Sequence, residues 1–375
     1  MKHSAASRTV GSKVRGMFAG VAVATALFTT ERLASGAEVR DPATRTPSAP
    51  PWRVGTEEHV DLWLHGFSLL TSDTGKVTFF ARGYRQQMMA LKKQRGVTTN
   101  LDVNMQKLQQ RFSMSPALAN AQFVAMYFSS LQELSTAMDL FVRAGGEPRR
   151  ASDPMQQQEI ALLAQNFPSP ADREWARLFM QSLQDESNKF YHAYWLGEQQ
   201  ARATGFSQFN QQWVGTWYPK LSRYLNNTQQ SAGEIILSLP LGGEGRTVNG
   251  GKTQNSIAVS YPKTGDAAPE ALFGFAHEAV AKLVDEAVND NTTPAEQRSG
   301  ATAGYTGNGA VRGGALLIEK TSPELAQAYM RYYVSQTGAT PPIGDPRAAF
   351  EAAFPLPAAI VTAVGKAIDS VLAGI

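Results

Sequence analysis

In this chain of 375 residues the hydrophobic periodicity switches from helical to β type after about residue 225, and that switch constrains the fold most. From about residue 57 to residue 225, apolar side chains recur at steps of three and four, which predicts helices nearly throughout. Two short runs of β type follow, Glu234–Leu239 and Asn255–Tyr261, with five glycines between them. The pattern predicts an α+β protein that is mostly helical, with a small β-hairpin or sheet ahead of a central helix.

Individual helices are predicted from the same spacing and from the residues that stop it. One covers Val124–Phe141 and ends before Gly145-Gly146, and a second long helix follows Pro170. Pro219 should bend or divide the aromatic segment 206–225. The central helix is expected at 270–288, and further helices at 308–319, 323–334 and 357–372.

The N-terminus has the composition of an export signal. Residues 1–37 contain a basic start, an apolar run over 17–28 and the small residues Ser35-Gly36-Ala37. The apolar run is shorter than the roughly 20 residues that span a bilayer. We therefore expect a signal peptide over 1–37, a Pro-rich linker over 38–54, a helical lobe over 55–225 and a core lobe over 226–375, in a secreted or periplasmic protein.

Charge and cysteine content exclude several classes of function. The predicted signal holds five basic residues and one acidic residue, a net of +4, so removing it from a chain of net +3 leaves about −1. Nucleic-acid binding is not expected of such a mature chain. The absence of cysteine excludes disulfides and thiol chemistry. No second apolar stretch is long enough for a membrane span.

The central helix carries the one pattern that points to chemistry. His277 shares an apolar face with Phe273, Val280 and Val284, and Glu278 is its neighbour. A helical zinc site of the HExxH type needs a second His one turn later, with the Glu activating a metal-bound water. Here that position is Ala281, so the motif reads HEAVA. A lone His on an apolar helix face is more often a core residue.

The order of elements around this motif resembles gluzincin-type, zincin-like secreted metallopeptidases. Long helices, an aromatic-rich helix, a glycine-broken hairpin and then a His-Glu helix follow one another, with Asn291–Pro294 and Phe354–Pro357 adding to the likeness. The resemblance covers roughly residues 170–375. It implies that His277 is the first metal ligand, that Glu278 is the general base, and that a peptide lies along an edge strand at Asn255–Tyr261.

The resemblance also shows where this chain departs from the family. The later helix that supplies a third ligand has Asn308 at the matching place, while Glu319 lies too deep and Glu296 would be a ligand on a loop. Among the other histidines, His65 or His192 would have to reach His277 across the fold. Tyr305 and Arg312 are candidates to line the site, although a turn tyrosine and a solvated arginine are the simpler interpretation.

Together these features predict a metallopeptidase-like protein with a degenerate zinc site. It would bind a peptide or protein ligand with weak or no catalysis, and it would hold no zinc or bind zinc weakly through His277. One alternative is an active zinc peptidase with a non-standard ligand set. Another is a non-enzymatic helical structural or binding protein in which the His277–Glu278 pair is coincidental.

Overall fold

The computed structural model describes residues 51–71, 77–249 and 251–374, so the expected export signal and most of the expected linker lie outside the described residues. The chain is α+β and mostly helical, as predicted. Its strands are β1 (Trp52–Gly55), β2 (Gly233–Ser238), β3 (Arg246–Asn249) and β4 (Asn255–Ser260). Its α-helices of ten residues or more are α1 (Glu58–Leu70), α2 (Tyr84–Arg95), α3 (Asn100–Met114), α5 (Leu131–Arg143), α6 (Pro154–Asn166), α7 (Pro170–Glu186), α8 (His192–Ala201), α9 (Ala203–Gln212), α10 (Tyr218–Asn227), α11 (Ala268–Asp290), α13 (Ala301–Thr321), α14 (Ala326–Gln336) and α16 (Ala358–Ala373).

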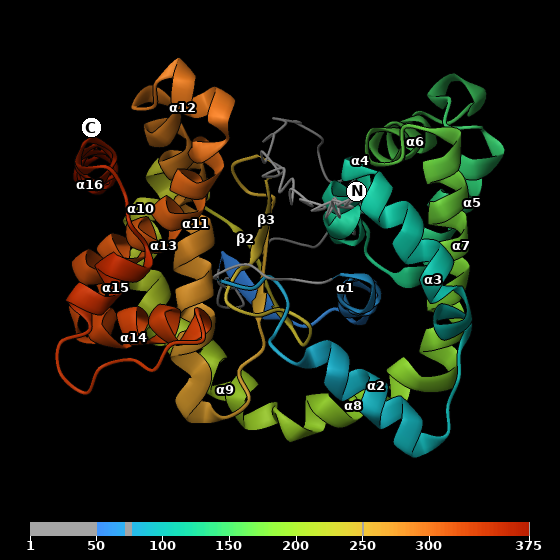
Figure 1. Ribbon diagram of the computed structural model, residues 1–375, viewed down its shortest axis with the longest axis horizontal. Coiled ribbons are helices and arrows are strands. Elements are labelled where there is room, and N and C mark those ends of the chain that lie inside the picture. Colours follow the sequence, from blue (N-terminus) through green and yellow to red (C-terminus); the bar gives the residue numbers. More distant parts are fainter. Residues whose placement is uncertain (1–50, 72–76, 250, 375) are drawn as a thin grey trace, which may run out of the picture.

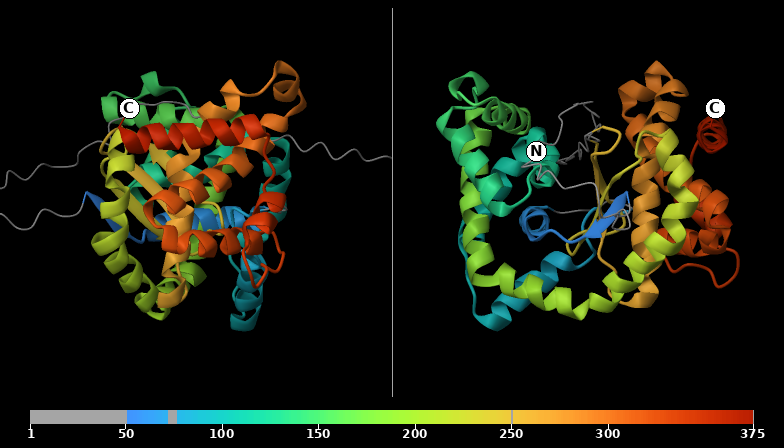
Figure 2. Two further views of the ribbon diagram at one scale, coloured as in Figure 1. Left: turned by 90° about the vertical axis from the view of Figure 1, so that its left-hand side faces the viewer. Right: turned by 180° about the vertical axis from the view of Figure 1, so that it is seen from behind.

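The sheet lies between two groups of helices (Figure 1). Helices α2, α3, α5, α6 and α7 form one group, and α11, α13, α14 and α16 form the other. Helix α8 runs between the two groups along one side of the molecule, a course that is also clear from behind (Figure 2). Helices α9 and α10 pack against α11 and α16 respectively, although the predicted boundary at residue 225 places them in the helical lobe. The division into two units stays a prediction.

The sheet is mixed and differs from the predicted hairpin. Its strand order is β1-β2-β4-β3, with β1, β2 and β4 parallel and β3 antiparallel to β4. The runs predicted to form a hairpin are parallel neighbours, because the glycine-rich stretch between them contributes β3. The segment 255–261, expected at an edge, is therefore interior as β4, and β3 is the edge strand on that side. Strand β1 also occupies residues that were assigned to the linker.

Backbone breaks alter two of the predicted helices. The segment 124–141 is divided into a 3₁₀ turn, Ala121–Tyr127, and α5, because the chain is extended at Phe128 and Ser130. The long helices after Pro170 and Phe206 each contain a π-helical turn, at Ser187–Tyr191 and Trp213–Trp217. Pro219 is the second residue of α10 and follows the π-helical turn Trp213–Trp217 without a gap in the helix, so it neither ends the helical segment nor separates it into two.

Helix α11 is the centre of the second group because it packs on β4 and on α13. Glycines on α13 permit this approach. A Cβ at Gly309 would lie 2.6 Å from a methyl of Val284, and one at Gly314 would lie 3.2 Å from the backbone nitrogen of His277. The pair His277–Glu278 is thereby enclosed between the sheet and α13.

In the parts of the chain that the structure describes, no single helix is long and apolar enough to cross a bilayer. Helix α15 (Arg347–Ala353) and α16 pass the criterion only as a pair, and they are bent by 113° where they meet.

Candidate functional site

The imidazole of His277 and the carboxylate of Glu278 are bonded to each other. His277 Nδ1 lies 3.0 Å from Glu278 Oε1, and both residues are buried, with 6% and 7% of their surface exposed. The hydroxyl of Thr247 on β3 donates to Glu278 Oε2 at 2.9 Å. Each carboxylate oxygen therefore already accepts a hydrogen bond from a neighbouring side chain.

The charge of Glu278 is stabilised despite its burial. Burial by itself raises the pKa of Glu278, but the hydrogen bond and charge of His277, the charge of Arg246 and the hydrogen bond from Thr247 outweigh it. The net effect lowers the pKa of this carboxyl below its usual value. Glu278 is consequently ionised at neutral pH, and an ionised carboxylate only accepts, so the shared proton is on Nδ1 of His277.

The backbone of the strand β3 comes close to this carboxylate because of one glycine. A Cβ at Gly245 would lie 2.6 Å from the carbonyl oxygen of Ala258 and 2.8 Å from Cγ of Glu278. Real Cβ contacts of that length do not occur without displacement of the neighbours. Gly245 is therefore required for the close approach of this segment to β4 and α11.

Two tyrosines of α14 complete the surroundings of His277. The ring of Tyr333 stacks on the imidazole, with centroids 6.0 Å apart and planes at 24°. Its hydroxyl lies 3.2 Å from the carbonyl oxygen of Gly243, ahead of β3, and 3.3 Å from that of Phe273 on α11. Tyr329 packs against Tyr333 and donates to the carbonyl of Val311 at 2.9 Å. These contacts fix the ring of His277 and connect α11, α14 and the loop before β3.

The side chains around His277 do not fit a zinc ion. Catalytic zinc sites use three protein ligands, usually His, Glu, Asp or Cys. Within residues 51–71, 77–249 and 251–374, no three such side chains gather closely enough to hold a metal. The position one turn after His277 is Ala281, and Nδ1 of His277 is bonded to Glu278.

The residues considered as substitute ligands have other partners. Glu296 caps a short helix, α12 (Pro294–Ser299), by accepting from the backbone N–H of Thr293 at 2.8 Å. The amide of Asn308 donates to the carbonyl of Pro355 at 2.9 Å, and Glu319 bonds Arg347 at 2.6 Å. The expectation that Glu296 lies on a loop was wrong, because Pro294 and the capping box start a helix there.

The two other histidines considered as ligands also lie elsewhere. His65 is fully buried in the first group of helices and bonds Glu186 at 3.1 Å. His192 is exposed and pairs with Glu58 at 2.9 Å. These two imidazoles therefore pair with Glu186 and Glu58, and not with His277.

The structure does not bring Tyr305 or Arg312 to the pair. On α13, Gly314 faces His277. Arg312 is two residues earlier, which rotates its side chain by about 200° around the helix axis, so it points away from His277. Tyr305 is nine residues before Gly314, about 13 Å along the axis. Its hydroxyl lies 3.3 Å from Glu296. These positions do not support the predicted role of Tyr305 and Arg312 beside His277.

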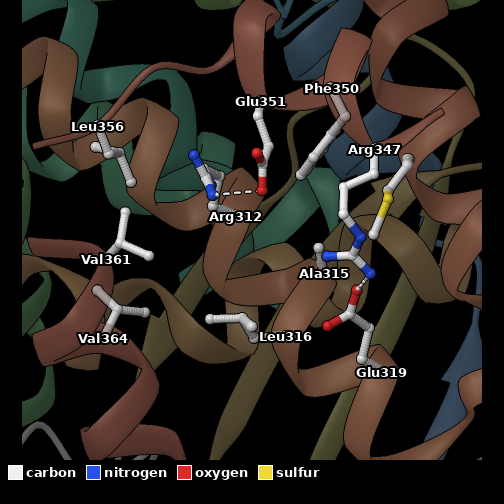
Figure 3. Close-up of a pocket in the computed structure, with 11 residues that line it drawn as sticks. Arg312, Ala315, Leu316, Glu319, Arg347, Phe350, Glu351, Leu356, Val361 and Val364 are labelled. Atoms are coloured by element: carbon white, nitrogen blue, oxygen red, sulfur yellow. Dashed lines mark hydrogen bonds and ion pairs between the residues drawn. The ribbon is translucent and has the colours of Figure 1, made fainter. Parts of the chain in front are cut away.

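Arg312 instead lines a separate pocket between α13, α14, α15 and α16. Figure 3 shows its guanidinium pointing toward Glu351, at 3.1 Å, while Arg347 points toward Glu319. Apolar side chains such as Leu316 form the remaining wall. The two cations of this pocket are already neutralised by carboxylates.

Three residues of the site were not found from the sequence: Arg246, Thr247 and Tyr333. Arg246 and Thr247 lie in a four-residue strand inside a glycine-rich stretch, where no β pattern is long enough to be recognised. Tyr329 and Tyr333 did carry a signal, since two tyrosines four residues apart share a helix face.

Comparisons with known proteins give no family for this chain. No protein-family model matches it, and neither the search of curated proteins nor that of solved structures found a match. The resemblance to gluzincin-type metallopeptidases therefore stays a hypothesis.

Proposed function

We propose that this chain is a metallopeptidase-like protein that binds peptides without hydrolysing them. The observation that carries the proposal is the state of Glu278. Its two oxygens accept hydrogen bonds from His277 and Thr247, so the carboxylate is already engaged where a general base would have to take a proton from water. Ala281 in place of a second His supports the same conclusion.

Peptide binding is supported by the position of β3. This strand pairs with β4 on one side, and no strand in the described part of the chain pairs with its other side. An exposed sheet edge binds extended peptides through backbone hydrogen bonds. The side chain of Thr247 on this strand contacts Glu278, so a peptide added here would lie beside the His277–Glu278 pair. Secretion or export to the periplasm is part of the proposal and rests on residues 1–37 alone.

Metal analysis and a peptidase assay test the loss of hydrolysis. The purified protein, incubated with zinc and desalted, should retain far less than one zinc per chain, and His277→Ala should leave that content unchanged. The matched control is His192→Ala, which alters an exposed histidine. Stoichiometric zinc that is lost only in His277→Ala, together with cleavage of a peptide mixture, would overturn the proposal in favour of an active peptidase with a non-standard ligand set.

A further inference from the structure

Arg246 is the first residue of β3, and its guanidinium is held between two aromatic rings. Its central carbon lies 4.5 Å from the ring centre of Phe79 and 4.5 Å from that of Phe123. Both rings come from the first group of helices and its connections, so they meet β3 from outside the core around α11. A guanidinium stacked in this way has little freedom to rearrange, which pre-organises its N–H donors for a ligand.

This cation has no close acid partner among the described residues. Its nearest ion pair is with Glu244 at 3.9 Å, and its one recorded hydrogen bond, to the carbonyl of Gly245, is long at 3.4 Å. The Nε–H is buried without an acceptor in the described part of the chain. Arginine carries five N–H donors in a planar fork that matches a carboxylate. The buried Nε–H is out of reach of a ligand, so the donors that an anion can use are those of the two terminal nitrogens, on a side chain that is 27% exposed.

The direction of β3 indicates which anion this would be. Because β3 begins at Arg246, a peptide that adds antiparallel to it has its C-terminal end beside Arg246. The stretch ahead of β3 is already paired, since the N–H groups of Gly242 and Gly243 bond the carbonyls of Phe79 and Thr78 at 2.8 and 3.1 Å. A peptide strand paired with β3 could therefore not continue past Arg246, because the stretch ahead of it is already paired with residues 78–79. The end of a peptide fits this position better than the middle of one.

We infer that β3 binds the C-terminal residues of a peptide and that Arg246 receives its terminal carboxylate. The inference rests on the proposed peptide-binding function and specifies the ligand of the same site. The backbone of the peptide extends the sheet beyond β3, and the carboxylate bonds the guanidinium between Phe79 and Phe123. Arg246 is thus a binding residue for the end of the peptide.

Three peptide pools test this inference on the full chain, immobilised and with retained peptides identified by mass spectrometry. Each pool consists of acetylated hexapeptides randomised among Val, Ile, Thr, Tyr and Phe, residues that favour strands. The first pool ends in a free carboxylate, the second in a carboxamide, and the third in a carboxamide with one internal Asp. We expect the first pool to bind about tenfold or more tightly than the other two, as expected for a charge-assisted hydrogen bond to a carboxylate.

Substitutions assign that preference to Arg246. Arg246→Met keeps an apolar stem between the two rings and should abolish the preference for the free carboxylate, while Arg246→Lys should retain part of it. The matched control is Arg53→Met on β1, the other edge strand, which should leave the preference intact. Circular dichroism melting of each variant separates loss of binding from loss of folding.

The outcomes separate this inference from the proposed function. If no pool is retained, peptide binding itself is wrong and the inference fails with it. If the carboxylate and carboxamide pools bind equally, and Arg246→Met changes neither, peptide binding stands and the role of Arg246 is overturned. Equal retention of the Asp-containing pool would show that an acidic side chain, and not the chain end, is the ligand of Arg246.

Discussion

The pairs His65–Glu186 and His277–Glu278 are both buried, but their carboxylates are neutralised differently. Glu186 has no exposed surface, and it accepts from His65 at 3.1 Å and from the ammonium of Lys92 at 2.7 and 2.9 Å. Glu278 accepts from the imidazole of His277 and from the hydroxyl of Thr247, and neither of these two donors is a lysine or an arginine. The first pair belongs to a closed ion cluster, whereas the second lies beside a strand edge.

Two buried His–Glu pairs can therefore differ in whether the charges around them are free to bind a ligand. In the first cluster every charge has a direct partner, since Lys92 also contacts Asp102 at 2.7 Å and Thr99 at 3.1 Å. Such a cluster has no capacity left for a ligand. In the second region, burial raises the pKa of Glu278 and the charge of Arg246 is among the causes that lower it. Within the described residues, the terminal N–H donors of Arg246 make only one long hydrogen bond, to the carbonyl of Gly245. Only the second region has a site for a further anion.

Removing the cation of the closed cluster should have the largest effect. Lys92→Met leaves Glu186 and Asp102 buried or half-buried without their counter-charge, which should lower the free energy of unfolding by about 3–5 kcal/mol. Urea unfolding followed by circular dichroism measures this. In the control Lys189→Met, which breaks an exposed pair with Asp185, the loss should be below about 1 kcal/mol. Similar losses in both variants would mean that the cluster is not closed.

The same cluster should make the fold sensitive to acid. Burial lowers the pKa of His65. Burial raises that of Glu186, but hydrogen bonds and charges from His65 and Lys92 reverse the shift and bring it to about 2. The unfolded chain therefore binds more protons below pH 6.5, and stability falls as the pH decreases. The share of Glu186, about 3 kcal/mol, is present above pH 4.5 and lost towards pH 2.

Urea unfolding between pH 7 and pH 2 tests this dependence. His65→Gln should remove the part of the decline that begins near pH 6.5, and it should also shrink the part below pH 4.5, because the hydrogen bond and charge of His65 help to lower the pKa of Glu186. His192→Gln, at the exposed histidine, should reproduce the profile of the unaltered chain. A profile that is identical in all three proteins would contradict the assignment to His65.

Substitution of Gly245, in the second region, should have an intermediate effect on the free energy of unfolding. Gly245→Ala would place a Cβ 2.6 Å from the carbonyl oxygen of Ala258 on β4 and 2.8 Å from Cγ of Glu278 on α11, so the chain at β3 must shift at a cost of about 2 kcal/mol. The matched control is Gly215→Ala, whose Cβ would meet no atom within 4 Å. Thermal melting should separate the two variants clearly. Equal melting temperatures would show that β3 does not depend on this close approach.

Sequence analysis predicted the fold class and the central helix but not the arrangement of the sheet. Local spacing is sufficient for α11, because its apolar face repeats over six turns. The interior position of β4 depends on pairing with β2 and β3, which no local pattern contains. Glu278 was recognised because it adjoins His277 in the sequence. Glu186 has no such neighbour, because its contacts with Lys92 and His65 span 94 and 121 residues.

Thr247 should have the smallest effect and is the most direct probe of the second pair. Thr247→Val keeps the shape of the side chain but leaves Oε2 of Glu278 without its recorded donor, a cost of about 1–2 kcal/mol. The same change should raise the pKa of Glu278 toward its ordinary value, because one of the bonds that favours the charged form is lost. The stability that Glu278 contributes above its ordinary pKa should therefore shrink, and with it the acid dependence below pH 4.5.

Urea unfolding at pH 7 and pH 4, compared with Thr253→Val in an exposed turn, measures both effects. If Thr247→Val unfolds like Thr253→Val at both values, Glu278 is not held by β3, and the hydrogen bond that carries the proposed loss of hydrolysis is absent in solution.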